Sequence, residues 1–213
     1  HPHGARHMID PSKLTAGATA VYGEEAFRKS FGELIPIDES RVIEAPDGHR
    51  LRLGSRELLC LDTPGHARHH ICIHDDQSQG IFTGDTFGLS YREFDTAAGP
   101  FLLATSTPIQ FDPEAWHQTL DRLMGLSPQV IYLTHYCAVE EPNKLVEQLR
   151  QSLDQFTRIA LAADAPAGEA RTAQIRTGLH DWLLESMQQH GCKLPQAEIE
   201  HLMEMDLELD AQG

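Results

Sequence analysis

The sequence predicts a mixed α/β fold in which short buried strands alternate with amphipathic helices. Four apolar runs have the length of buried strands, and they lie at residues 58–61, 71–73, 81–83 and 130–133. Further along the chain, apolar residues recur at the 3.6-residue spacing of a helix. Three of the strands are followed by turns that carry histidine or aspartate, and polar side chains on such loops commonly form binding sites.

The first part of the chain predicts helices followed by a strand meander. Asp10 and the proline after it predict an N-cap and a first helical position. We therefore expect a helix through residues 14–21 and a second helical piece over 24–31. Short strands are expected at 42–45 and 51–53, on either side of a Pro-Asp-Gly turn. This meander leads to the first of the histidine-bearing turns.

After the third strand the predicted elements are a loop and then helices. Residues 86–108 lack a clear period and hold several aromatic side chains, so we expect a long loop beside the site. Asp112, followed by proline and glutamate, predicts a helix start, and Gly125 predicts its end. Amphipathic helices are expected over 142–163 and around 175–187. We expect the acidic residues of the C-terminal stretch to face solvent.

Charge and cysteine content limit the classes of function. The net charge of −15 comes from 17 basic and 32 acidic residues, and it repels nucleic-acid phosphates and anionic lipids. We therefore expect neither a nucleic acid nor a membrane as partner, and no apolar run has the length of a bilayer span. Four cysteines lie far apart without a CxxC pair, which favours reduced thiols and a cytoplasmic location. Cys137 is expected to pack behind its loop.

Three turns hold residues with metal-ligand chemistry. The chain reads Thr-Pro-Gly-His up to His66, Phe-Thr-Gly-Asp up to Asp85 and Leu-Thr-His up to His135. Proline and glycine end a strand, so His66 is presented at a strand end. Imidazole nitrogens and carboxylate oxygens bind zinc, iron or manganese. Each turn alone is ordinary turn chemistry, but the three together point to a metal site.

The order of these motifs resembles that of the metallo-β-lactamase-fold hydrolases, and their spacing is most like the glyoxalase II-type branch. The resemblance implies a metallo-β-lactamase-like αβ/βα sandwich over residues 1–138, with a C-terminal helical extension over 139–213. It also implies that His66, Asp85 and His135 are metal ligands, with Asp85 as the catalytic bridging carboxylate. The implied cofactors are two divalent ions, zinc in the first place, with iron or manganese as alternatives.

Other residues near these motifs receive supporting roles from the resemblance. His70 keeps the family's spacing of three intervening residues after His66, although His69 stands where the family usually has glycine. We expect His70 to orient a ligand rather than to bind metal itself. Phe87 and Tyr91, on the long loop, are expected to line the substrate pocket.

The implied activity is hydrolysis of an ester, thioester or lactone, in which a metal-bound hydroxide attacks the carbonyl of a small-molecule substrate. The family's zinc β-lactamases commonly have a cysteine on the loop where Asp85 falls, so its absence argues against antibiotic hydrolysis. Two alternatives stay open. One is a mononuclear iron thiol or persulfide dioxygenase, and the other is a metal-free binding member of the family. A homo-oligomer is compatible with the sequence.

The opening segment, residues 1–8, has three competing interpretations. It is a degenerate form of the family's first His-x-His-x-Asp-His motif, a remnant of an expression tag, or an internal stretch of a longer protein. The motif requires aspartate and histidine where alanine and arginine stand, and a guanidinium does not bind a cation. We therefore expect the first ligands upstream of residue 1, and weak metal binding by residues 1–213 alone. His1, His3 and His7 receive no assigned role.

Overall fold

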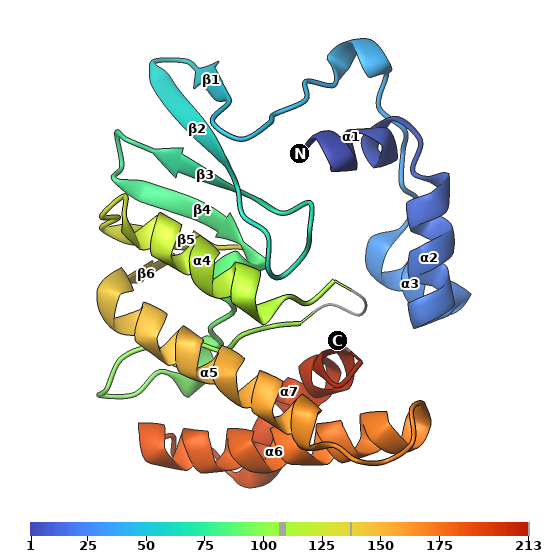
Figure 1. Ribbon diagram of the computed structural model, residues 1–213, viewed down its shortest axis with the longest axis vertical. Helices are drawn as coiled ribbons and strands as arrows, with labels where there is room; N and C mark the ends of the chain where they lie inside the picture. Colours follow the sequence, from blue (N-terminus) through green and yellow to red (C-terminus); the bar gives the residue numbers. More distant parts are fainter. Residues whose placement is uncertain (107–109, 137, 213) are drawn as a thin grey trace.

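The computed structural model describes residues 1–106, 110–136 and 138–212, and it contains one six-stranded sheet flanked by helices (Figure 1). The strands lie side by side in chain order. Their bounds are β1 Arg50–Leu53, β2 Arg56–Asp62, β3 Ile71–Asp75, β4 Gly80–Gly84, β5 Val130–Leu133 and β6 Ala138–Glu140. The mixed α/β fold class is thus confirmed, as are the strands predicted at 51–53, 58–61, 71–73, 81–83 and 130–133.

The directions of the strands decide which loops meet. Neighbouring strands are antiparallel except β4 and β5, which are parallel and are connected through helix α4 (Pro113–Met124). Because β3 runs antiparallel to both β2 and β4, these two strands point the same way, and β5 shares their direction. The carboxyl ends of β2, β4 and β5 therefore lie at one edge of the sheet. The three predicted ligand turns follow these three ends.

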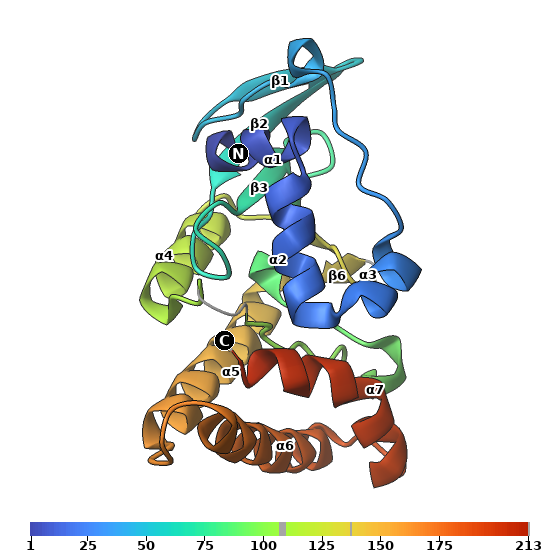
Figure 2. The ribbon, with the colours of Figure 1, turned by 90° about the vertical axis from the view of Figure 1, so that its right-hand side faces the viewer.

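The helices of the described residues flank the sheet and extend beyond it. Their bounds are α1 Pro2–Ile9, α2 Ser12–Tyr22, α3 Glu24–Phe31, α4 Pro113–Met124, α5 Pro142–Ala162, α6 Glu169–His190 and α7 Gln196–Asp210. Helices α4 and α5 lie over one face of the sheet (Figure 1), and α7 lies on the sheet side of α6 (Figure 2). Among the described residues, none of the helices combines the length and the apolar character that a bilayer span requires.

The sequence signals for α4 and for the later helices act as predicted. The Asp112 carboxylate accepts a hydrogen bond from the Ala115 N–H at 3.0 Å, and Pro113 occupies the first turn. The helix ends at Gly125. Helix α5 covers nearly all of the stretch predicted at 142–163, so both the start signals and the apolar spacing are confirmed.

One continuous core joins the sheet to all of the C-terminal helices. The fully buried side chains of the sheet, of α4, of α5 and of α6 include Ile81, Ile131, Trp116, Leu120, Leu149, Leu153, Leu179 and Leu183. Burying one such aliphatic side chain contributes about 1.5–3 kcal/mol. Helices α5 to α7 are therefore held by the same hydrophobic effect as the sheet.

The helices predicted at 14–21 and 24–31 are confirmed as α2 and α3, whereas the strand predicted at 42–45 is wrong. Residues 42–45 are not a strand, because β1 forms the edge of the described sheet and pairs with β2 alone. Helix α1 occupies residues 2–9, where no helix was predicted, and it begins with Pro2 in its first turn. Helix α2 begins at Ser12, one residue later than expected, although Asp10 still accepts the Ser12 N–H at 3.1 Å.

The acidic C-terminal stretch does not face solvent throughout, which corrects another expectation. Asp210 is only 5% exposed and Asp206 is half-buried, whereas Glu204 and Glu208 are exposed. Residues four apart lie on one face of a helix. One acidic face of α7 therefore turns into the protein, while the other is solvated.

The predicted division at residue 138 stays a prediction. Strand β6 runs across this position to Glu140 and pairs with β5, so the sheet extends beyond the expected boundary. Within the described residues there is one β layer, which accounts for one αβ half of an αβ/βα sandwich.

We expect Leu183→Ala to lower the free energy of unfolding by about 2–5 kcal/mol, because it leaves a cavity in the shared core. Leu183 is 1% exposed on α6. The matched control is Leu161→Ala on α5, where the leucine is 79% exposed, and it should change stability little. Urea unfolding of both variants measures the difference. Equal effects would contradict the packing of α6 into this core.

Candidate metal centre

The loop after β2 presents His66, and helix α4 holds that loop in place. The Thr119 hydroxyl donates to the Pro64 carbonyl at 2.7 Å. Gly65 has a φ of 139°, and a Cβ atom there would lie 2.4 Å from the Cβ of Trp116. Only glycine permits this close approach of the loop to the helix. The Pro-Gly turn therefore does more than end a strand, because it fixes where the next side chain lies.

The His66 ring is oriented as a metal-binding imidazole is. Its Nδ1 lies 2.8 Å from the carbonyl oxygen of Thr105. A carbonyl oxygen only accepts, so Nδ1 carries the proton and Nε2 of the neutral ring carries the lone pair. Nε2 lies 3.6 Å from Oδ2 of Asp85, and the His66 side chain is 10% exposed. Histidine ligands commonly donate their other N–H to a carbonyl in this way.

Asp85 begins a short 3₁₀ turn after β4, and His70 fixes its backbone. The Asp85 N–H donates to Nε2 of His70 at 3.1 Å. Nδ1 of His70 therefore carries the proton, and it lies 2.8 Å from the Thr86 hydroxyl oxygen. Burial lowers the pKa of His70 to about 4, and the nearby His66 adds to this effect. His70 is thus neutral at physiological pH and bonds to the backbone of Asp85.

The residue before Asp85 is glycine because His70 lies so close to the backbone of this turn. Gly84 has a φ of 50°, and a Cβ atom there would lie 2.5 Å from Nε2 of His70. A larger residue would push His70 away from the turn. The glycine of the Thr-Gly-Asp motif therefore permits the histidine contact that holds the aspartate.

His135 follows β5 and approaches Asp85 from the other side. Its Nε2 lies 3.3 Å from Oδ1 of Asp85, and its side chain is 52% exposed. Oδ1 is buried and lacks a hydrogen-bond partner among the described residues. Tyr136, the next residue, has a φ of 70°, a conformation that a tyrosine rarely adopts. Such strain is concentrated at functional sites.

The three predicted ligands thus meet at one carboxylate. His66 lies against Oδ2 of Asp85, and His135 lies against Oδ1. A buried carboxylate oxygen beside an imidazole nitrogen is stable when a proton or a cation lies between them. Imidazole nitrogens and a carboxylate are a donor set that fits divalent cations, and His66, Asp85 and His135 would be the side chains to hold them here. No group of three or more ligand side chains around one point occurs in the described part of the chain.

The structure separates the two residues predicted to line the substrate pocket. Phe87 has 0% exposure and packs in the core, so the expectation of a pocket role is corrected. Tyr91 borders a cavity of about 720 Å³ together with Tyr136 and α7. Its hydroxyl donates to Oδ2 of Asp206 at 2.7 Å, and burial raises the pKa of both Tyr91 and Asp206. Tyr91 therefore bonds to a carboxylate of α7 in this structure.

The N-terminal histidines lie beside the site without forming a regular motif. Nε2 of His1 lies 3.3 Å from Oδ1 of Asp62. His3 and His7 line a cavity that also includes His69. His69 borders a neighbouring cavity of about 390 Å³ as well, and that cavity contains the three side chains His66, His70 and Asp85. Cys137, whose packing was predicted, lies outside the described residues.

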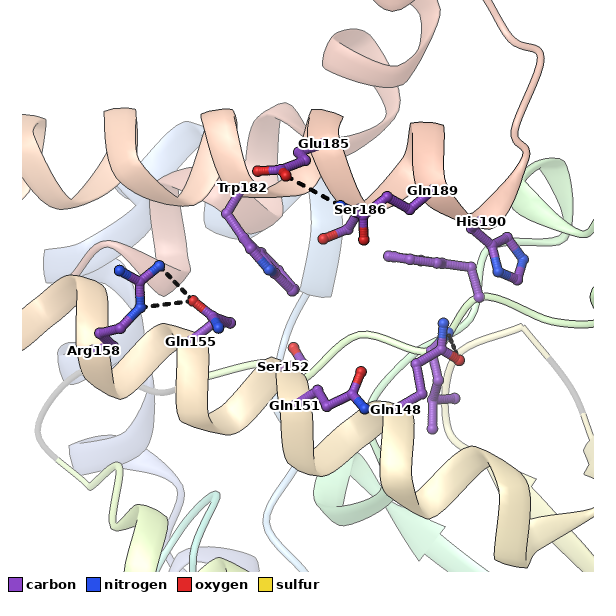
Figure 3. A pocket seen from close by; sticks show the side chains of 12 residues that line it. Gln148, Gln151, Ser152, Gln155, Arg158, Trp182, Glu185, Ser186, Gln189 and His190 are labelled. Carbon is purple, nitrogen blue, oxygen red and sulfur yellow. Dashed lines mark hydrogen bonds between the residues drawn. The ribbon is translucent and has the colours of Figure 1, made fainter.

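A polar groove between α5 and α6 is a separate cavity of about 460 Å³ (Figure 3). Several of its side chains bond to neighbours within the protein. Arg158 donates twice to Gln155, and Gln189 donates to Glu185 (Figure 3). The groove contains one histidine, His190, and one carboxylate, Glu185, rather than two histidines around one carboxylate, so we regard the site at the strand ends as the functional centre.

Sequence reasoning missed the residues that support the histidines. Thr105 contacts His66 through its backbone carbonyl. Every residue has such a carbonyl, so the contact does not require a particular side chain and cannot be predicted from the sequence. Asp206 and Asp210 belong to a helix more than 60 residues beyond His135. Their four-residue spacing was a signal for one shared face, but it did not show that this face points inward.

These observations define a class: an α/β protein with an imidazole–carboxylate cluster at the carboxyl ends of strands that run in one direction. The chain belongs to the metallo-β-lactamase superfamily, whose family profile matches residues 2–135. Members of this superfamily bind metal ions, and the superfamily includes hydrolases.

Two curated relatives indicate the range of this family. The chain is 29% identical over 169 residues to a metallo-β-lactamase fold-containing protein of Sulfurisphaera tokodaii. This alignment covers 78% of this chain and 60% of the relative. The chain is also 29% identical over 131 residues to a hydroxyacylglutathione hydrolase of Fuscovulum blasticum. That alignment covers 62% of this chain and 44% of the relative. The chain thus spans between two fifths and three fifths of the length of these relatives.

Solved structures show the same fold. The crystal structure of an archaeal metallo-β-lactamase superfamily protein from Sulfolobus tokodaii aligns with a TM-score of 0.55 and 25% identity, covering 84% of this chain and 63% of that one. A metallo-β-lactamase family protein from Thermus thermophilus aligns with a TM-score of 0.53 and 19% identity, covering 83% of this chain and 56% of that one.

We expect Gly65→Ala to lower the melting temperature more than Gly54→Ala does. Both glycines have positive φ, but a Cβ atom at Gly54 meets nothing within 4 Å, whereas one at Gly65 collides with Trp116. The strain of the backbone costs about 1–2 kcal/mol in each case, and the collision adds about 1–3 kcal/mol. Thermal unfolding followed by circular dichroism measures both. Equal losses would show that the loop does not depend on the close approach.

We expect residues 1–213 to bind Zn²⁺ weakly. The described residues offer two protein ligands for each of two ions, whereas a zinc hydrolase site typically has about three. Equilibrium dialysis followed by metal analysis measures the stoichiometry and the affinity. Two zinc ions retained through gel filtration would contradict the expectation and would indicate further ligands in this chain.

Proposed function

We propose that this protein is a metal-dependent hydrolase that cleaves an ester, thioester or lactone. The observation that supports this proposal best is the placement of two histidine nitrogens on opposite oxygens of Asp85, at 3.6 Å and 3.3 Å. One carboxylate with an imidazole on each side favours two cations over one. It therefore favours a hydrolase over the mononuclear iron dioxygenase. Oδ1 is buried without a hydrogen-bond partner among the described residues and has Nε2 of His135 at 3.3 Å, which favours a metal-binding protein over a metal-free binding member.

In this proposal His66, Asp85 and His135 hold the cations, with zinc in the first place and iron or manganese compatible with the same ligands. Divalent cations held there would supply Lewis acidity and would lower the pKa of a bound water toward about 7. Asp85 would contribute the negative charge of the donor set. The Asp85 N–H donates to Nε2 of His70 at 3.1 Å, so His70 holds the turn that carries Asp85.

The substrate proposed is a small molecule with an activated carbonyl. The relative from Fuscovulum blasticum is named as a hydroxyacylglutathione hydrolase, and a Gallus gallus relative is named as an acyl-coenzyme A thioesterase, with 38% identity over 50 residues. Both names describe cleavage of thioesters. The cavity of about 390 Å³ that contains His66, His70 and Asp85 is the space available beside the proposed ligands, whereas the cavity beside Tyr91 and Tyr136 contains none of them. A net charge of −15 disfavours nucleic acid and membrane partners, and a cytoplasmic location is part of the same proposal.

We expect Asp85→Asn to lower hydrolysis of a test thioester by more than about 100-fold and to reduce bound metal, because the bridge between the cations loses its charge. Asp76→Asn is the matched control, since Asp76 is 75% exposed at the turn after β3 and should change neither quantity. Both variants are assayed as the full chain with divalent metal in excess, so that the weak binding expected above does not limit the turnover of either variant. Wild-type turnover and metal content in Asp85→Asn would exclude the proposed role, whereas oxygen uptake with one bound iron would support the dioxygenase instead.

A further inference from the structure

A single peptide group connects helix α7 to His66. The carbonyl of the Thr105–Ser106 peptide accepts from Nδ1 of His66 at 2.8 Å. The N–H of the same peptide group donates to Oδ1 of Asp210 at 2.7 Å. These two hydrogen bonds lie on opposite sides of one planar amide, so they form a continuous chain from a carboxyl group to an imidazole ring.

Asp210 is buried, and further hydrogen bonds support its contact with the Ser106 N–H. It is 5% exposed at the end of α7, and burial raises its pKa well above the ordinary value. The Ser106 hydroxyl donates to the Asp210 carbonyl at 3.1 Å and approaches Oδ1 at 3.3 Å. A buried carboxyl group is costly unless its hydrogen bonds are satisfied, so this pairing is a specific interaction.

We propose that Asp210 is a positioning residue for His66, acting through the Thr105–Ser106 peptide. By accepting the N–H, Asp210 polarises the amide and makes its carbonyl a stronger acceptor. A stronger acceptor holds the proton on Nδ1 of His66, fixes the ring and makes Nε2 a better donor to a cation. The effect on metal rests on the proposed function, whereas the effect on the imidazole does not depend on it.

Other hydrogen bonds of this loop provide controls that distinguish a specific effect of Asp210 on His66 from a general loosening of the loop. The Ala104 N–H donates to the Ser152 hydroxyl at 3.0 Å, which fastens the loop to α5 through a different peptide group. The Leu102 N–H donates to Oε1 of Gln148 at 3.1 Å, which is a second bond between this loop and α5. Both Ser152→Ala and Gln148→Ala loosen the loop at other peptide groups without removing a bond to Asp210 or His66, so they are matched controls.

The test compares Asp210→Ala and Asp210→Asn with the two controls in the full chain. The first readout is the nitrogen and Hδ1 NMR signals of His66 in the metal-free protein, which report the tautomer and the strength of the Nδ1 hydrogen bond. The second readout is the affinity for Co²⁺ alone, followed by its absorption spectrum. Asp210→Asn keeps the shape and one oxygen acceptor, so it provides a folded variant even if Asp210→Ala does not fold.

We expect Asp210→Ala to shift the His66 Hδ1 signal upfield, to reduce the Nδ1–H tautomer and to weaken Co²⁺ binding by about tenfold. Asp210→Asn should change the same quantities less, and the controls should stay within about twofold of wild type. His66 signals that do not respond to either Asp210 variant, or that respond equally to the controls, would overturn the proposal. A responsive His66 in a protein that binds no metal would refute the proposed function and leave the positioning role standing.

Discussion

The carboxylate of Asp85 is the group on which the arrangement of the site depends. It receives His66 on one oxygen and His135 on the other, and its own backbone is held by His70. This requires that three strand ends open at the same edge of the sheet. The antiparallel strand β3 between β2 and β4, and the parallel pair β4–β5, meet that requirement.

Trp116 connects the two halves of this site through helix α4. Its side chain packs against Gly65 and its ring lies at right angles to that of His66, with centroids 5.5 Å apart. Its indole N–H donates to the Thr86 carbonyl at 2.6 Å, next to Asp85. One fully buried side chain thus fixes both turns relative to each other. The crossover helix between the parallel strands β4 and β5 therefore contacts the turns that carry His66 and Asp85.

Helix α7 connects the C-terminal part of the chain to His66 through hydrogen bonds. Its two inward-facing carboxyl groups lie one turn apart, with Asp206 bonded to Tyr91 and Asp210 bonded to the peptide group whose carbonyl contacts His66. A helix that only covered the core would need no polar groups on its inner face, because burying them is costly. Helix α7 therefore contributes to the core and, in the role proposed for Asp210, also helps to hold the ring of His66.

The sequence by itself determined five of the six described strands, most of the helices and the three ligand candidates. Turn chemistry and apolar spacing are local, and they are legible in residues such as Asp112 and His66 without any knowledge of the fold. Only the tertiary structure decided that the three turns meet at Asp85, that Phe87 lies in the core while Tyr91 borders a cavity, and that Asp210 reaches Ser106 across 104 residues. Strand direction and pairing between distant segments depend on how whole elements pack. A single stretch of sequence does not contain that information.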